Sequence, residues 1–366
     1  MEYNLTQLLK TMVDQNASDL HISVNSPPRI RINGSLVSLQ VPALTSEQAK
    51  ELCYSSLENH QKAKFEQEKE VDLAFSVPDL ARFRANIFLQ KGEISGSFRV
   101  IPSEIKSLDD LHLPPVFKEL CSIPRGLILV TGPTGSGKST TLAAMVDHIN
   151  QNRYEHIVTV EDPIEFLHPH KNCVVNQREL GGDTDSFARA LKSILRQDPD
   201  IVLVGEMRDL ETISAAVTTA ETGHLVFATL HTNSCVQTLN RIIDAFPPHQ
   251  QGQVRAQLSM SLQAVISQTL IPRIDQGRCL ALEVMIPNSA IQSLISEGKF
   301  NQIYSYMQQG QNKSGMQTLN QSLFSLVTKK TISKQLAFEK SNNVEELAQM
   351  FTRVGNTVAE PNKKPA

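Results

Sequence analysis

Residues 132–139 read GPTGSGKS, which is the spacing of a phosphate-binding P-loop. Its glycines allow the backbone to curl so that successive N–H groups point at an anion, and the helix expected to begin near Lys138 adds the positive end of its dipole. An ordinary Gly-rich turn would leave the Gly-Lys-Ser order unexplained. We therefore predict that a nucleoside triphosphate binds here, with Lys138 on the outer phosphates and the Ser139 hydroxyl on Mg²⁺. The candidate binding residues are Gly132, Pro133, Thr134, Gly135, Ser136, Gly137, Lys138, Ser139 and Thr140.

Acidic residues follow two further apolar segments. Residues 156–160 continue into Glu161, Asp162 and Glu165, and residues 200–204 are followed by Gly205 and Glu206. The carboxyl ends of parallel strands are where such sheets bind ligands, so these carboxylates are expected near the phosphates. An apolar strand that ends in an acid about 70 residues after a P-loop is typical of a Walker B element, whose carboxylate holds the Mg²⁺ hydration shell or orients the attacking water.

Two histidines flank another apolar segment, residues 225–229. Because an extended chain advances about 3.3 Å per residue, His224 and His231 lie roughly 20 Å apart and cannot bind one metal ion. His231 is expected at the carboxyl end of the strand, beside the phosphates, where it can sense the γ-phosphate. A purely structural histidine is the alternative, and His224 requires a different explanation.

The segments around these residues alternate between strand and helix patterns. Helices are predicted over residues 187–197 and 210–221, which together with the apolar strands indicate an α/β fold with a mostly parallel sheet covered on both faces. After Pro248, five apolar positions predict one long helix; they are Val254, Leu258, Leu262, Val265 and Leu270. A strand at residues 279–285 and several short helices follow, and residues 351–366 read as a disordered tail.

The first hundred residues have a different pattern. Alternating apolar residues and two short helices predict a small α+β domain with an antiparallel sheet over residues 1–102, followed by a Pro-containing linker at 103–115. Within that sheet Arg82 and Arg84 fall on the face opposite Phe83, and Arg99 is placed similarly. Arginines on such a face are usually solvated or paired with acids, but a shared guanidinium face can also reach phosphates.

Composition narrows the possible functions. With 366 residues and a hydrophobic fraction of 40%, the chain can build two packed cores. Its net charge of −3 gives no overall attraction to nucleic acid, and its five cysteines are too far apart in sequence to suggest a zinc knuckle or a disulfide framework. No signal peptide or apolar stretch of membrane-spanning length is present, so we expect a cytoplasmic protein that meets the membrane only through a partner.

Four blocks occur in a fixed order: GPTGSGKST, TVEDPIEF, DIVLVGEMRDLETI and TGHLVFATLHT. This set resembles the Walker A, Asp box, Walker B and His box of the secretion-type ATPase superfamily, and the resemblance extends over nearly the whole chain, including SDLHIS and RFRANIF near its beginning. The chain lacks the extra N-terminal domains and the paired Cys-x-x-Cys insert of the pilus assembly ATPases. It is therefore similar to the PilT-like retraction ATPases of type IV pili.

That resemblance implies a cytoplasmic homohexamer that binds ATP and Mg²⁺ and acts with a platform protein at the inner-membrane base of the pilus. In such a ring a PAS-like N-terminal domain packs against the RecA-like ATPase domain, here residues 116–350, of a neighbouring subunit. Carried onto this sequence, Arg84 and Arg99 reach the phosphates in trans. Glu165 becomes the general base and Glu206 the acid on the metal side, with the reverse assignment open.

One segment departs from the pattern. Retraction ATPases typically carry AIRNLIRE near the C-terminus, whereas residues 290–297 here read AIQSLISE, with Gln292 and Ser296 in place of arginines. An accessory ATPase similar to PilU, working with a paralogous retraction motor, and a low-turnover nucleotide-dependent scaffold are therefore the alternatives. A nucleic-acid translocase on the same core is disfavoured by the acidic charge and the lack of an aromatic and basic stripe.

Overall fold

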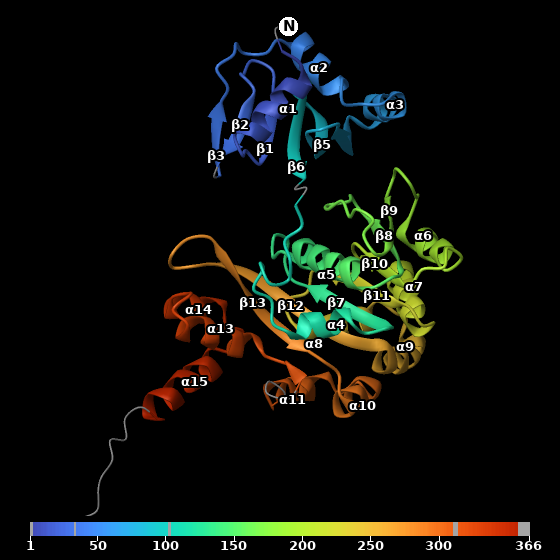
Figure 1. Cartoon of the computed structure of the whole chain (residues 1–366), viewed down its shortest axis with the longest axis vertical. Coiled ribbons are helices and arrows are strands. Elements are labelled where there is room, and N and C mark those ends of the chain that lie inside the picture. Colours follow the sequence, from blue (N-terminus) through green and yellow to red (C-terminus); the bar gives the residue numbers. More distant parts are fainter. Residues whose placement is uncertain (1–2, 33, 102–103, 310–313, 358–366) are drawn as a thin grey trace, which may run out of the picture. The chain divides into compact units, whose positions relative to one another are not determined.

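The computed structural model of the chain describes residues 3–32, 34–101, 104–309 and 314–357. The chain divides into two compact units (Figure 1). The first consists of Met1–Ile105 and Pro163–Leu167, and the second of Lys106–Asp162 and His168–Ala366. Leu108 and Leu113, from the segment that the sequence marks as a linker, are buried in a core of the second unit.

The first unit is an α+β fold built on one sheet. Its strands are β1 (Asp19–Ile22), β2 (Arg29–Ile32), β3 (Ser35–Ser38), β4 (Glu70–Val77), β5 (Ala81–Gln90) and β6 (Glu93–Ile101). Every neighbouring pair in the order β3-β2-β1-β6-β5-β4 is antiparallel. The predicted antiparallel α+β domain is thus confirmed.

Three helices accompany this sheet: α1 (Leu5–Asp14), α2 (Ser46–Tyr54) and α3 (Asn59–Glu68). α1 and α2 both begin with a capping box, formed by Asn4 with Gln7 and by Thr45 with Gln48. In α1 the buried side chains recur every three or four residues, so one stripe of the helix packs into the core of this unit.

The second unit contains a seven-stranded sheet in the order β13-β12-β7-β11-β10-β8-β9. All neighbouring pairs are parallel except β12 with β13. The strands are β7 (Gly126–Thr131), β8 (His156–Glu161), β9 (Val174–Glu179), β10 (Ile201–Val204), β11 (Leu225–Leu230), β12 (Leu262–Pro272) and β13 (Arg278–Met285). The predicted, mostly parallel sheet is confirmed.

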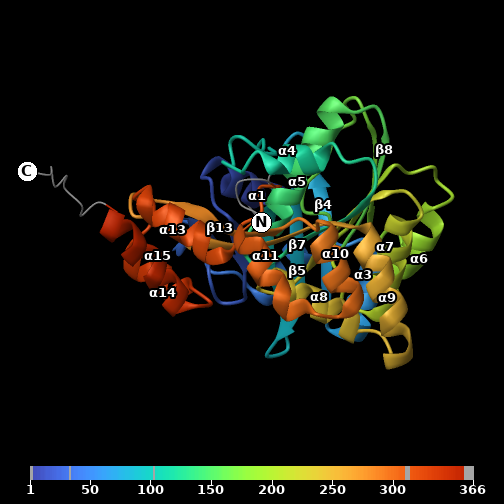
Figure 2. The ribbon, with the colours of Figure 1, turned by 90° about the horizontal axis from the view of Figure 1, so that it is seen from below.

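Helices cover both faces of this sheet (Figure 2). One core joins the sheet to α6 (Phe187–Ile194), α7 (Leu210–Glu221), α8 (Cys235–Asp244) and α9 (Pro248–Ser261). The other joins it to α4 (Val116–Cys121) and α5 (Lys138–Asn152). Alternate residues of β7 serve the two cores, with Leu127 and Leu129 in the first and Ile128 and Val130 in the second, which explains why its sequence is apolar throughout.

The long helix predicted after Pro248 is wrong. α9 ends at Ser261, and β12 begins at Leu262 and inserts between β7 and β13. Val265 and Ile266 are fully buried and pair with β7 and β13, and their branched side chains suit a strand. Because a strand buried on both faces has no period of two, its apolar residues could not be distinguished from a buried helix by spacing.

The C-terminal part consists of short helices: α10 (Ser289–Glu297), the 3-10 turn η1 (Phe300–Gln302), α11 (Ile303–Gln309), α13 (Leu319–Thr328), α14 (Lys334–Lys340) and α15 (Val344–Thr357). α15 extends beyond residue 351, where the sequence places the start of a disordered tail. The reason is packing, because the ring of Phe351 lies 4.9 Å from that of Phe324 on α13. Residues 358–366 of that predicted tail lie outside the described residues.

Candidate nucleotide-binding and catalytic site

The P-loop connects β7 to α5, as the sequence predicts. Gly132, Gly135 and Gly137 have φ values of 141°, 79° and 87°, which side chains strongly disfavour. A Cβ atom on Gly132 would lie 2.2 Å from the carbonyl oxygen of Gln268, so only glycine fits there. Gly137 is the N-cap residue of α5. Because glycine has no side chain, the N-cap residue makes no side-chain hydrogen bond to the first N–H groups of the helix.

Lys138 lies across this loop. Its Nζ donates to the carbonyl oxygens of Gly132 at 2.8 Å and Pro133 at 3.2 Å. Ser139 and Thr140 are half-buried in the first turn of α5, whereas residues 133–135 are exposed. All nine predicted binding residues therefore lie together on one loop and helix turn, and this glycine-lined cradle with one ammonium group fits a nucleotide phosphate chain.

Gln268 on β12 completes the loop and was missed from the sequence. Its Nε2 donates to the carbonyl oxygen of Ser136 at 2.8 Å, and the residue is 1% exposed. It therefore fastens the middle of the P-loop to the sheet. The only sign of its role in the sequence was a polar residue inside an apolar run. Because this segment was predicted to be a helix, that sign was overlooked.

Glu161 and Glu206 lie at the same edge of the sheet because β8 and β10 are parallel neighbours. Their backbones approach closely, since a Cβ on Gly205 would lie 3.1 Å from the Cα of Glu161. Glu161 is 9% exposed and accepts from the Thr159 hydroxyl at 2.7 Å. Of the carboxylates predicted at this edge, Glu161 and Glu206 therefore lie close together in the second unit.

Glu206 contacts two basic side chains. Its Oε1 lies 3.1 Å from Nε2 of His231, and its Oε2 lies 2.8 Å from a guanidinium nitrogen of Arg208. Partial burial acts to raise the pKa of Glu206, but the hydrogen bonds from Arg208 and His231 outweigh it and leave the pKa below its usual value. Glu206 is therefore ionised at neutral pH and is a weak proton acceptor, which suits a carboxylate on the metal side.

The two histidines of the β11 segment have different surroundings. His231 follows the carboxyl end of β11, beside Glu206, and β11 is the direct neighbour of β7 in the sheet. His224 precedes β11, where its Nδ1 lies 3.0 Å from the carbonyl oxygen of Thr219 and 3.2 Å from the Thr222 hydroxyl. His224 therefore interacts with the C-terminal turn of α7, which gives it a structural role.

The remaining predicted residues belong to the first unit. Arg84 on β5 and Arg99 on β6 are directly opposite each other in the antiparallel register. Like charges at opposite positions destabilise a sheet, and an anion placed between them relieves that cost. Both side chains are exposed, and Arg82 is half-buried two residues before Arg84.

Asp19 holds one of these arginines. Nε of Arg99 lies 2.8 Å from Oδ1 of Asp19, and Nε of Arg31 lies 3.6 Å from Oδ2. Burial acts to raise the pKa of Asp19, but hydrogen bonds from Ser18 and Arg99 lower it below the usual value. The Arg99 side chain nevertheless stays 70% exposed, so it is held by Asp19 while most of its surface faces solvent.

Glu165 is exposed and lies in Pro163–Leu167, the segment that groups with the first unit although both flanking segments belong to the second. The second unit thus brings together the P-loop, Glu206 and His231. Arg84, Arg99 and Glu165 belong to the first unit.

Comparison with known proteins agrees with this fold and site. A model of the Type II/IV secretion system protein family matches residues 1–348. The chain belongs to this family of secretion ATPases. In the part of the chain that the structure describes, no helix is long and apolar enough to cross a membrane.

Within the family, the chain is similar to pilus retraction proteins. It is 52% identical over 338 residues to the type IV pilus retraction ATPase PilT of Pseudomonas aeruginosa, covering 92% of this chain and 98% of PilT. It is 39% identical over 346 residues to the type IV pilus ATPase PilU of the same organism, covering 94% of this chain and 90% of PilU. A crystal structure of the pilus retraction motor PilT with bound ADP matches with a TM-score of 0.90 and 48% identity over 95% of this chain and 100% of that one. The resemblance to PilT-like retraction ATPases and the predicted fold class are confirmed.

Proposed function

We propose that this chain is a motor ATPase that couples ATP hydrolysis to the retraction of type IV pili by removal of pilin subunits. The observation that supports it best is the arrangement of the P-loop, Glu206 and His231 at the carboxyl ends of neighbouring parallel strands. The similarity to PilT over nearly the full length of both chains supports the same conclusion. Steady-state phosphate release from the purified protein, compared with Lys138→Ala, tests it.

In this proposal each residue of the site has a distinct role. The P-loop and Lys138 bind the phosphates of ATP, and the Ser139 hydroxyl and Glu206 hold Mg²⁺, which neutralises charge on the phosphates when bound. Because its two basic partners lower the pKa of Glu206, we assign the general base to Glu165. His231 orients Glu206 and senses the γ-phosphate.

The assembly is proposed to be a cytoplasmic homohexamer that works at an inner-membrane pilus platform protein. Arg84 and Arg99 belong to the first unit at opposite positions of β5 and β6, and their two guanidinium groups have the charge to bind a phosphate. In a ring they reach the nucleotide of the neighbouring subunit. Light scattering with ATP and Mg²⁺ tests the assembly, since a fully active monomer contradicts it.

A second candidate is an accessory role beside a paralogous retraction motor. Two observations favour it: the 39% identity to PilU, and Gln292 and Ser296 at positions where retraction ATPases typically have arginines. Both side chains lie on α10, which packs through Ile291, Leu294 and Ile295. The decisive experiment is twitching motility of a strain in which this chain is the only retraction ATPase, with Gln292→Arg and Ser296→Arg as rescue variants.

A further inference from the structure

The loop formed by residues 162–167 carries Glu165 and is the first part of the connection from β8 to β9. Gln177 on β9 bonds both ends of this loop. Its Oε1 accepts from the backbone N–H of His168 at 2.8 Å, and its Nε2 donates to Oε1 of Glu161 at 3.2 Å. A single side chain thus closes the loop at its base.

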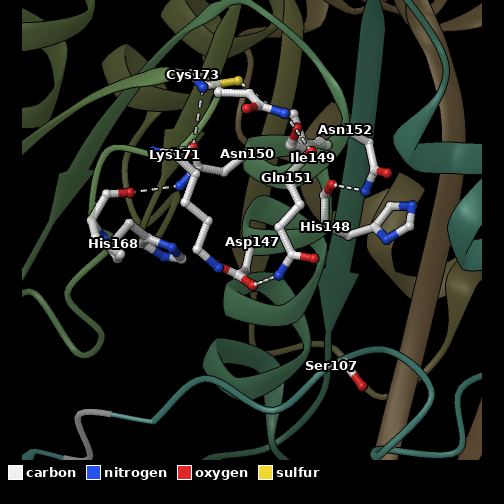
Figure 3. Close-up of polar contacts among 12 residues, drawn as sticks. Ser107, Asp147, His148, Ile149, Asn150, Gln151, Asn152, His168, Lys171 and Cys173 are labelled. Atoms are coloured by element: carbon white, nitrogen blue, oxygen red, sulfur yellow. Dashed lines mark hydrogen bonds and ion pairs between the residues drawn. The ribbon is translucent and has the colours of Figure 1, made fainter.

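The segment that follows the loop is fastened to the P-loop helix (Figure 3). Asn150, fully buried near the end of α5, accepts from the backbone N–H groups of Lys171 at 3.2 Å and Cys173 at 3.3 Å. Its Nδ2 donates to the carbonyl oxygen of Pro169 at 2.7 Å. The exit of the loop therefore moves with the helix that begins at Lys138.

An ion pair between an exposed lysine and a buried aspartate strengthens this attachment. Nζ of Lys171 lies 2.6 Å from Oδ1 of Asp147 on α5, and Gln151 donates to the other carboxylate oxygen at 2.6 Å (Figure 3). His168, at the start of the segment, is 8% exposed, and burial lowers its pKa to about 4. It is therefore a neutral, packed side chain at the point where the loop rejoins the second unit.

We propose that Gln177 is a positioning residue for Glu165, which rests on the proposed role of Glu165 as general base. Gln177 contacts the start of the loop through the Glu161 side chain and its end through the backbone of His168, so one side chain bridges the two ends of residues 162–167. Without Gln177 the Glu161 side chain and the His168 backbone lose their shared partner, and we expect Glu165 between them to lose its alignment with the attacking water. A misplacement of about 1 Å costs on the order of a hundredfold in rate.

The first test compares two substitutions of the same type. Gln177→Leu removes both bonds, whereas Gln257→Leu removes a bond from Gln257 Nε2 to Glu221 of 2.7 Å between α9 and α7, away from the loop. For Gln177→Leu we expect kcat for ATP hydrolysis to fall about 10- to 100-fold, with KM and ADP affinity within about twofold of the wild type. For Gln257→Leu we expect no change. Normal turnover of Gln177→Leu overturns the proposal.

A double-mutant cycle separates positioning from a general structural role. If Gln177 acts through Glu165, adding Gln177→Leu to Glu165→Gln causes no further loss of kcat. Multiplicative losses show instead that Gln177 acts through the rest of the fold and overturn the inference. If Glu165→Gln alone retains full activity, the assignment of the general base fails, which is a different outcome from a failure of Gln177.

The pH profile of Gln177→Glu gives an independent readout. The new carboxylate can still accept from His168, but it donates to Glu161 only when protonated, and the nearby Glu161 raises its pKa. We therefore expect the activity of Gln177→Glu relative to the wild type to rise as the pH falls from about 8 to about 6. A relative activity that is constant over this range overturns the proposed bond to Glu161.

Discussion

His231 Nε2 lies 3.1 Å from Oε1 of Glu206, although the two residues come from the ends of different strands. β10 and β11 are parallel neighbours, and their carboxyl ends bring the two side chains together beside the P-loop strand. A histidine that donates to the carboxylate keeps it ionised and fixes its rotamer. The contact therefore couples the strand next to the phosphates to the proposed metal ligand.

We predict that His231→Ala lowers kcat for ATP hydrolysis about tenfold or more, because Glu206 loses an orienting partner. Loss of this partner also raises the pKa of Glu206, so the acid limb of the pH–rate profile shifts to higher pH. His224→Ala, at the other end of β11, is the matched control and should leave the profile unchanged. An unshifted acid limb in His231→Ala would mean that Glu206 does not depend on this contact.

Removal of the P-loop ammonium group should abolish turnover. Lys138→Ala deletes the only side-chain charge of the P-loop, and we expect phosphate release to fall about a hundredfold or more, with weaker ATP binding. The fold should persist, because Lys138 is only half-buried and bonds to loop carbonyl oxygens. Phosphate release and circular dichroism measured on the same preparation check both points, and residual turnover equal to the wild type contradicts the site.

The trans arrangement of the arginines can be tested by mixing variants. Arg84→Ala should leave ATP affinity nearly unchanged and lower turnover about a thousandfold, as expected for a trans arginine. Arg189→Ala removes an exposed arginine of α6 that pairs with Asp185, two residues before that helix begins, and should have no effect.

Inactive Arg84→Ala and Lys138→Ala subunits should partly restore turnover when mixed, because some interfaces then combine an intact P-loop with an intact Arg84. The measurement is phosphate release as a function of mixing ratio. Strictly additive residual activities at every ratio would place Arg84 and the P-loop in the same subunit.

Asp19 should stabilise the first unit in a pH-dependent manner. Its pKa is lowered in the folded protein, so its contribution is present above the unfolded pKa and is lost as the pH falls through the folded pKa. Asp19→Asn should destabilise the full chain by about 1–3 kcal/mol at neutral pH, because Arg99 and Arg31 lose a charged partner, and the difference should shrink in acid. Urea unfolding at about pH 7 and at decreasing pH down to about 2 measures it, with Asp275→Asn as an exposed control expected to leave the midpoint at neutral pH unchanged.

The sequence predicted those parts of the site that depend only on residues close together in the chain. The P-loop, the acid after β10 and the histidine after β11 each follow an apolar strand, so their positions could be derived from the alternation of elements alone. The partners of these residues could not be derived in that way. Arg208 lies two residues from Glu206, but only the turn after β10 shows that their side chains meet.

Two strands were missed or assigned wrongly because the spacing of apolar residues does not show which strands are neighbours in the sheet. β9 is an edge strand in which only Val175 is buried, so it has too few apolar residues to be recognised. β12 is the opposite case, since it is apolar on both faces and resembles a buried helix. Both strands carry glutamines that contact the site, Gln177 and Gln268, and these contacts appeared only in three dimensions.

Gln268 provides the last prediction. Its side chain donates to the carbonyl oxygen of Ser136, so Gln268→Leu retains the size of the residue but frees the middle of the P-loop. The loop must then be ordered when nucleotide binds, and the loss of one buried hydrogen bond of about 1 kcal/mol corresponds to roughly fivefold weaker binding. We expect ADP affinity to fall by about this factor, with kcat at saturating ATP nearly unchanged, which is the reverse of the pattern expected for Gln177→Leu. Isothermal titration with ADP and steady-state kinetics on both variants distinguish them, and equal losses of kcat in the two would show that the P-loop and the Glu165 loop are not separately supported.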